Sequence, residues 1–384
     1  MPDESPYGFH LAEEFGWRLI FSTDAQDGTG CRLLRRCIRK LLGFDLIHAW
    51  ANRNSLRAAD IVWTMTENEW LAARCLAVMV PSTRRPIIGN SVWLFDAWQR
   101  KGRIARRLLA KLARGAGVLT VHSNRYVPLA RAALPGVRVD RMYFGIALEE
   151  RDFVVPATRL RTRVEPLRVL AMGNDRTRDW DTFLAAFGND PRFQIDLICS
   201  WVGQDQRSGY ANLVHREPAT ALSRQEATRL YIWSDVVVVP MKENSFSGIT
   251  SAIDACGRGK PVISTRTGGV PTYFDEGEVL YVEPGDAAAL RHAALLAPEQ
   301  LVQLARAGQA RFRRDDYTSR GMVRRYISLS EQVLADDRRS SKQLDPHYLE
   351  IATSDDIPSV SSAGDLTHDS TLPFSGGVIE AIDD

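Results

Sequence analysis

The residues with the clearest chemical potential follow a strongly apolar segment near position 240. The run SDVVVVP at Ser234–Pro240 is rich in β-branched side chains, which is typical of a strand buried on both faces. A group of small and hydroxyl residues follows at the expected start of a helix: Ser247, Gly248, Ile249 and Thr250. The start of a helix carries unpaired N–H groups and a partial positive charge, so this group suits a bound diphosphate.

An acidic residue lies one helical turn beyond this group. Asp254 stands four residues after Thr250, on the same face of the predicted helix. A carboxylate there can accept hydrogen bonds from ribose hydroxyls, as the acidic residue of dinucleotide-binding folds does. Each of these residues alone is also consistent with a helix cap or a solvated helix position. The interpretation therefore rests on the segment as a whole.

A second group of candidates lies in a basic loop that follows a strand pattern ending near position 172. Gly173, Arg176 and Arg178 lie in this loop, and a family resemblance given below implies a phosphate-binding role for them. Arginine suits this task because its planar guanidinium can bind phosphate oxygens in a bidentate manner. Arg216, just after a later strand, is a further candidate. The alternative interpretation is a solvated charged loop.

Alternating apolar runs predict the scaffold that positions these loops. We predict strands at 17–22, 45–48, 61–64, 86–89, 117–121 and 139–143, and then at 168–171, 194–200, 211–215, 235–240, 261–265 and 279–283. Helical periodicity fills the intervening segments. Such alternation predicts parallel sheets with right-handed crossovers, and therefore Rossmann-like layers that bind ligands beyond the carboxyl ends of their strands.

Polar residues at predicted strand ends of the first half are candidates for catalysis, and the family resemblance given below implies that they act on the acceptor side. His48, Glu67 and Asn90 lie at or just after such strands, and Glu243 is a candidate in the second half. His and Glu side chains can exchange protons with a reacting group. For each of the three first-half residues, a structural hydrogen bond is an equally good interpretation.

The chain length predicts two α/β domains with additional segments. We predict an N-terminal acceptor-side Rossmann-like domain at 1–150, a linker at 151–166, a C-terminal Rossmann-like domain at 167–310, C-terminal helices at 311–338 and a disordered tail at 339–384. Ser, Asp, Thr, Pro and Gly dominate the tail. The chain opens without the apolar strand that usually begins such a domain. Either the coding start lies upstream, or the first sheet lacks that strand.

Composition excludes several classes of function. The net charge of +2 implies no bulk polyelectrolyte partner, and no recognised nucleic-acid-binding module is present. Five scattered cysteines form no CxxC pair or Cys/His cluster, so we predict no metal site and a reduced, cytoplasmic compartment. No apolar stretch approaches the roughly 20 residues of a membrane span, and no secretory signal is evident.

The segment from about 167 to 305 resembles the C-terminal domain of family 4 glycosyltransferases, the glycosyl transferases group 1 type with the GT-B fold. The family pattern appears here as Asp254-Ala255, Gly259 to Val262 and Gly268-Gly269. The resemblance implies a retaining glycosyltransferase that needs no metal or other cofactor. It implies a UDP- or GDP-linked sugar donor held by the loop residues named above. By analogy, the acceptor is a glycan or a lipid-linked glycan, as in polysaccharide or glycoconjugate biosynthesis.

The sequence departs from the family pattern at three places. Phe246 stands where the family has its first Glu, so Glu243 could replace that residue only through a different loop path. Asp254 replaces the second Glu, and the loop after Asn90 lacks a His that some relatives carry. Phe246, the missing first strand and the absent His favour a second hypothesis, a non-catalytic glycosyltransferase-like partner or scaffold. A UDP-sugar epimerase is a third hypothesis, although its carboxylate and histidine signature is not evident.

Two predicted helices of the first half carry basic faces. In 32–42 and 101–114, Arg and Lys residues interleave with Leu and Ile. One interpretation is a pair of amphipathic helices with solvated basic faces. The other is a domain that rests on anionic lipid at the inner face of the cell membrane, where a lipid-linked acceptor would be presented.

Overall fold

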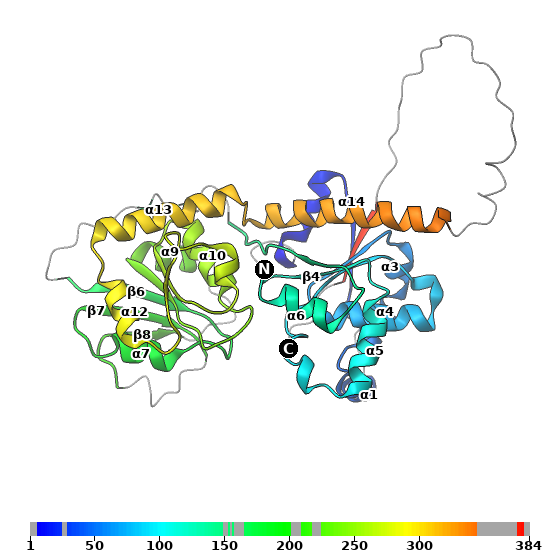
Figure 1. The fold of residues 1–384 in the computed structure, drawn as a ribbon, viewed down its shortest axis with the longest axis horizontal. Coiled ribbons are helices and arrows are strands. Elements are labelled where there is room, and N and C mark those ends of the chain that lie inside the picture. Colours follow the sequence, from blue (N-terminus) through cyan, green and yellow to red (C-terminus); the bar gives the residue numbers. More distant parts are fainter. Residues whose placement is uncertain are drawn as a thin grey trace, which may run out of the picture. The chain divides into compact units, whose positions relative to one another are not determined.

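The computed structural model describes residues 6–24, 29–148, 153, 156, 165–200, 209–216, 224–343 and 375–379. They form two six-stranded sheets whose described strand pairs are all parallel (Figure 1). Each sheet is accompanied by helices, as the alternating sequence pattern predicts. The predicted GT-B architecture of two Rossmann-like domains is confirmed. No described helix combines the length and apolarity that crossing a bilayer requires.

The first sheet has the strand order β1-β12-β2-β3-β4-β5. Its strands are β1 (Arg18–Phe21), β12 (Ser375–Ile379), β2 (Val62–Thr64), β3 (Ile87–Asn90), β4 (Val118–Val121) and β5 (Val139–Arg141). Every residue of β2, β3 and β4 is buried. Strands buried on both faces favour the apolar, β-branched composition seen in these segments.

The second sheet has the order β11-β10-β9-β6-β7-β8. Its strands are β6 (Leu167–Met172), β7 (Phe193–Ile198), β8 (Leu213–Arg216), β9 (Val236–Val239), β10 (Val262–Thr265) and β11 (Leu280–Val282). The four valines of β9 are fully buried between β6 and β10. A cluster of buried Phe, Leu, Ile and Val side chains packs α7 and α12 against this sheet.

The helices follow the strands in regular alternation. In the first half they are α1 (Thr29–Leu42), α2 (Leu46–Ala51), α3 (Arg53–Ala58), α4 (Glu67–Met79), α5 (Arg103–Ala113) and α6 (Tyr126–Ala133), with 3-10 helices at Pro6–Phe15, Pro81–Thr83 and Trp98–Arg100. In the second half they are α7 (Trp180–Phe187), α9 (Arg224–Trp233), α10 (Ile249–Gly257), α11 (Val270–Tyr273), α12 (Ala287–Ala294), α13 (Pro298–Arg314) and α14 (Ser319–Gln343).

The chain groups into two compact units that interleave in sequence. The first unit contains 1–9, 121–132 and 141–323, and the second contains 10–120, 133–140 and 324–384. The loops of the second sheet therefore belong to the first unit, whereas β1, β2, β3, α1 and α5 belong to the second unit.

One predicted strand is wrong. The segment predicted as a strand at 45–48 begins helix α2, because Asp45 caps that helix. The Asp45 Oδ1 atom accepts a hydrogen bond from the His48 backbone N–H at 2.9 Å. A side chain that satisfies an otherwise unpaired N–H group stabilises the start of a helix. The other predicted strands are present with only small shifts at their ends.

The structure also differs from the expected disordered tail. Ser375–Ile379, the red strand of Figure 1, pair in parallel with β1 on one side and with β2 on the other. Strand β12 thus lies inside the first sheet, between two strands from the first half of the chain. Most of the predicted linker and the rest of the tail beyond 343 lie outside the described residues.

Candidate functional site

Two loops at the carboxyl edge of the second sheet are joined into one platform. One follows β6 and contains 173–179, and the other follows β9 and contains 240–248. The Lys242 N–H donates to the Thr177 carbonyl oxygen at 2.8 Å, and the Asp179 N–H donates to the Pro240 carbonyl oxygen at 3.1 Å. Strands β6 and β9 are direct neighbours. The parallel order of the sheet therefore brings both predicted phosphate-binding loops together.

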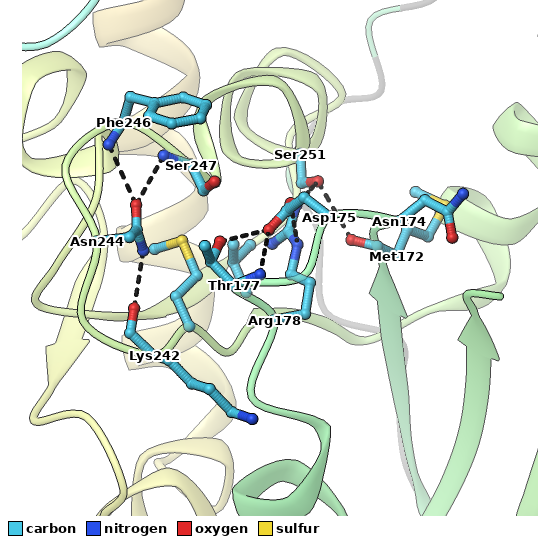
Figure 2. A network of polar contacts seen from close by, with 12 residues as sticks. Met172, Asn174, Asp175, Thr177, Arg178, Lys242, Asn244, Phe246, Ser247 and Ser251 are labelled. Carbon is cyan, nitrogen blue, oxygen red and sulfur yellow. Dashed lines mark hydrogen bonds and ion pairs between the residues drawn. The ribbon is translucent and has the colours of Figure 1, made fainter. Parts of the chain in front are cut away.

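Arg178 belongs to the first of these loops, and its positively charged side chain is buried (Figure 2). Its Nε donates to Asp175 Oδ2 at 3.0 Å, and its Nη2 donates to Ser251 Oγ at 2.9 Å. The third nitrogen, Nη1, is buried and has no hydrogen-bond partner among the described residues. Burial lowers the pKa of Arg178, and the neighbouring Asp175 carboxylate opposes this shift. A buried guanidinium with a spare donor is well suited to an anionic ligand.

Gly173 allows the backbone to pass close to Arg178. A Cβ atom at this position would lie 2.2 Å from Arg178 Nε, so any larger residue would displace the guanidinium. Arg176 extends from the same loop and is exposed. The three candidates of this loop are therefore neighbours, with one arginine buried below it and one at its surface.

The start of α10 is shaped by Gly248 and Asn244. Gly248 has a φ of 88°, and a Cβ atom there would meet Met241 Sδ at 2.4 Å. Asn244 Oδ1 accepts hydrogen bonds from the N–H groups of Phe246 and Ser247 at 3.1 and 2.8 Å, as Figure 2 shows. The N–H groups of Gly248, Ile249 and Thr250 donate to no acceptor in the described part of the chain. The amides open to a ligand thus begin at Gly248, one residue later than the Ser247 start predicted from the sequence.

Phe246 and Glu243 are both held by residues that follow β4. The Phe246 ring stacks on Tyr126 with ring centroids 5.8 Å apart and planes tilted by 19°. Glu243 is 65% exposed and forms an ion pair of 2.7 Å with Arg125. Arg125 also donates to the Asn244 carbonyl oxygen at 3.0 Å. Glu243 therefore serves as a partner of Arg125 in this structure, at the edge of the platform.

Asp254 and Arg216 are already engaged by partners within the protein. Asp254 Oδ1 accepts from Arg258 Nε at 2.8 Å, and this arginine is buried. Arg216 lies on β8, at the edge of the sheet beyond β7, and pairs with both oxygens of Asp196. The strand order separates Arg216 from the loops of β6 and β9. It is not part of the platform, whereas Asp254 remains on the helix that begins there.

In the second unit, Glu67 and Asn90 lie at the carboxyl ends of β2 and β3, as predicted. The Glu67 carboxylate accepts hydrogen bonds from the N–H groups of Val92 and Trp93 at 2.9 and 3.2 Å. Burial raises the pKa of Glu67. Asn90 is fully buried, and its Nδ2 donates to the Met65 carbonyl oxygen at 2.8 Å. Both side chains fix loop geometry at this sheet edge.

His48 lies on α2 rather than at a strand end, because Asp45 starts a helix there. Its ring is buried, with Nδ1 3.3 Å from Asp24 Oδ1 and Nε2 3.4 Å from Asn52 Nδ2. It belongs to a local network of polar side chains on its own element and the loop after β1. Within the described residues, no group of three or more His, Cys, Asp or Glu side chains is arranged to hold a metal ion.

Sequence reasoning missed two residues that organise the platform. Asn244 accepts the first amides before α10, and Ser251 links Arg178 to the Met172 carbonyl oxygen. An Asn two residues before a Phe-Ser pair is a signal for a side-chain turn, since Asn often binds the backbone two residues further on. Ser251 carries no comparable signal, because its partner lies far away in the sequence.

Comparison with known proteins agrees with this architecture. Residues 166–297 match the family model described as "Glycosyl transferases group 1". A sucrose-phosphate synthase from Thermosynechococcus elongatus is similar in structure, with a TM-score of 0.61 and 19% identity over 86% of this chain and 92% of that chain. No curated protein sequence matches the chain significantly.

Two further solved structures contain bound nucleotide. Anabaena HepE in complex with UDP and glucose has a TM-score of 0.58 and 14% identity, covering 85% of this chain and 95% of that one. A trehalose-6-phosphate protein from E. coli bound with UDP-2-fluoro glucose has a TM-score of 0.58 and 13% identity, covering 80% of each chain. At these identities the likeness concerns the fold.

Proposed function

We propose that the chain transfers a sugar from a nucleotide-diphosphate sugar to a glycan or lipid-linked acceptor, with retention at the anomeric carbon. The match of residues 166–297 to the glycosyl transferases group 1 family and the GT-B fold of the chain support this proposal. The observation that carries this proposal is the buried Arg178 next to the start of α10. Within the part of the chain that the structure describes, neither Arg178 Nη1 nor the first amides of α10 have a hydrogen-bond partner. UDP is the favoured nucleotide, since two similar structures hold UDP-linked compounds or UDP.

The chemistry of this platform matches the needs of a leaving diphosphate. Negative charge develops on the diphosphate as the bond to the sugar breaks, and fixed N–H dipoles and a guanidinium stabilise that charge without rearranging. The amides of Gly248, Ile249 and Thr250 would bind phosphate oxygens, and Arg176 would approach from the surface of the loop. Arg178 would act from below, once the loop at Gly173 shifts enough to open Nη1 to the ligand. No metal is needed for this electrostatic role.

A non-catalytic nucleotide-sugar-binding subunit is the second candidate. Phe246 stands where the family has a Glu and packs on Tyr126, while Glu243 pairs with Arg125. In the second unit, Glu67 and Asn90 satisfy backbone groups. These engagements favour a protein that keeps the donor platform and has lost the sugar-facing carboxylate.

Donor binding tests the platform. Calorimetric titration of the full chain with UDP, GDP, UDP-glucose and GDP-mannose should reveal one class of nucleotide that binds. R178M should weaken that binding by at least about tenfold, because a buried charged donor is lost. R192A is the matched control, since Arg192 is an exposed arginine of the same unit that pairs with Asp190. Equal affinities for wild type and R178M, or no nucleotide binding at millimolar concentration, would refute the donor site.

Turnover separates the two candidates. The bound nucleotide sugar is incubated with the full chain and candidate glycan acceptors, and released nucleotide and the anomeric proton of the product are followed by NMR. A product with the donor's anomeric configuration supports a retaining transferase. Donor binding without release of nucleotide, under all acceptors tested, supports the non-catalytic subunit.

A further inference from the structure

Helices α1 and α5 of the second unit expose large apolar side chains to solvent. On α1, Leu33 and Leu41 are 58% and 84% exposed, and on α5, Ile104 and Leu108 are 84% and 48% exposed. The residues of α5 that are buried in the unit are Leu109, Leu112 and Ala113. Ile104 and Leu108 instead present much of their apolar surface to solvent.

The two helices repeat one arrangement of apolar and basic side chains. On α1, Leu33 is followed three positions later by Arg36, and on α5, Ile104 is followed three positions later by Arg107. One helical turn further along, Cys37 to Lys40 and Leu108 to Lys111 repeat it. Residues four apart lie on the same face, so each helix carries an apolar row with a basic row beside it.

The charge of these faces is of one sign. Neither α1 nor α5 contains an Asp or Glu residue. Within the described part of the chain, Arg36, Lys40, Arg107 and Lys111 form no ion pair. Arg35 is different, because it points to Asp24 and Asp45 and is largely buried. Asp24 and Asp45 thus compensate the charge of Arg35, whereas the charges of Arg36 and Lys40 on α1 are not compensated by any described acidic residue.

Apolar and basic rows side by side suit one kind of partner best. Double-stranded nucleic acid would contact the basic row, but it offers nothing to bury Leu41 or Ile104. A protein partner would cover the leucines, but it would not require two all-basic flanks. An anionic bilayer satisfies both, since its acyl boundary takes apolar side chains and its headgroups attract Arg and Lys.

We propose that α1 and α5 dock the second unit on the surface of an anionic lipid bilayer. The helices lie in the interface, with Leu33, Leu41, Ile104 and Leu108 inserted below the headgroups and the basic rows against the phosphates. This binding is independent of the donor platform, which belongs to the first unit.

Vesicle co-sedimentation of the full chain tests the proposal. The vesicles contain phosphatidylcholine alone, or phosphatidylcholine with about 30 mol% phosphatidylglycerol, and ionic strength is varied from about 0.1 to about 0.5 M. We expect the chain to bind the anionic vesicles at least about tenfold better than the neutral ones, and to dissociate at high salt.

Two variants separate the apolar and basic contributions. L41S/I104S should reduce binding to anionic vesicles at least about fivefold, and R36Q/K40Q/R107Q/K111Q should abolish the difference between the two vesicle types. V214S/L295S is the matched control, since it changes two exposed apolar residues of the first unit and should leave binding unchanged. Unaltered thermal unfolding of each variant shows that the fold persists.

Several results would overturn the proposal. Equal binding to neutral and anionic vesicles, or full binding by L41S/I104S, would rule out a combined apolar and basic contact. Binding of a labelled DNA duplex that depends on the basic row, but not on Leu41 and Ile104, would identify a nucleic-acid surface instead. An oligomer in light scattering that L41S/I104S dissociates, without vesicle binding, would identify a contact between copies of this chain.

Discussion

Arg178 and Ser251 are joined by a hydrogen bond of 2.9 Å from the guanidinium Nη2 to the serine Oγ, although 73 positions separate them in the sequence. Ser251 Oγ in turn donates to the Met172 carbonyl oxygen at 3.2 Å. The serine thereby fixes the buried arginine to the end of β6 from the first turn of α10. This hydroxyl and the Asp175 carboxylate together fix the position of the positive charge.

Replacing Ser251 by Ala should destabilise the protein and weaken donor binding. A second nitrogen of Arg178 would lose its buried partner, which typically costs about 1–3 kcal/mol. Chemical denaturation should report this loss, and calorimetry should show nucleotide affinity reduced about tenfold. Thr250→Ala is the control for stability, because Thr250 is exposed and its change should cost less than about 0.5 kcal/mol. Equal stabilities of the two variants would contradict this role of Ser251.

Replacing Asn244 by Asp should distinguish the role of this residue in shaping the loop from the effect of local charge on diphosphate binding. Asp retains the side-chain oxygen that accepts from the N–H groups of Phe246 and Ser247, so stability should stay within about 1 kcal/mol of wild type. The added negative charge beside the open amides should weaken diphosphate binding at least about tenfold. Asn189→Asp places the same charge on an exposed loop and serves as the control. Unchanged nucleotide affinity in N244D would place the diphosphate elsewhere.

The protein should lose stability in mild acid through His122. Burial lowers the pKa of His122 from 6.5 to about 4, while its Nδ1 lies 2.9 Å from the Met142 carbonyl oxygen. As pH falls below 6.5, the unfolded chain binds a proton that the folded chain does not, so the free energy of unfolding decreases until pH reaches about 4. The full effect is about 3 kcal/mol.

Denaturant unfolding between pH 4 and 7 measures this dependence. His122→Gln should have a flatter pH profile than wild type, because the titrating group is removed. His292→Gln, a change at an exposed histidine, should keep the wild-type profile. Parallel profiles for wild type and H122Q would show that His122 is not the source.

Glu67 should behave as a residue that holds a loop. E67A leaves the N–H groups of Val92 and Trp93 without their acceptor and should cost about 1–3 kcal/mol of stability. E67Q keeps an acceptor oxygen and should retain most of the stability and any turnover. A proton-transfer role would give the opposite result, with E67Q stable but inactive. Unfolding and turnover measured on both variants distinguish these outcomes.

Removing β12 should loosen the first sheet. Deletion of 375–384 takes away the strand that pairs with both β1 and β2. Hydrogen exchange at β1 and β2 should accelerate by at least about tenfold, while β6 and β9 should be unaffected. Deletion of 380–384 alone keeps the strand and is the matched control. Identical exchange in the two deletions would argue against the pairing.

The sequence predicts the scaffold better than the contacts on it. The β-branched runs and alternating elements are sufficient to identify both sheets and the two loops that meet at β6 and β9. The strand expected at 45–48 is the exception, since an apolar run of this length fits either a strand or a helix, and the capping role of Asp45 decides between them. At this segment the capping hydrogen bond of Asp45 determines the structure, and the apolar pattern does not.

Site residues are predictable from the sequence where their role depends on the loop that contains them. Gly173, Arg176 and Arg178 lie in the loop where they were expected, and Gly248 precedes α10. The partners of Arg178 and Glu243 were not predictable, because Ser251 and Arg125 come from distant elements. The strand β12 was missed for a related reason. Its short sequence with two glycines gives no strand pattern, and the strand is recognised only by its pairing with β1 and β2.

The place of β12 also sets an order of events during synthesis. Strands β1 and β2 leave the ribosome early, but the strand between them lies more than 300 residues behind β2. At ordinary rates of translation, that interval lasts on the order of tens of seconds. The second sheet, whose strands all lie between 167 and 282, can close in the meantime. The edges of β1 and β2 that pair with β12 therefore stay unpaired until β12 has been synthesised.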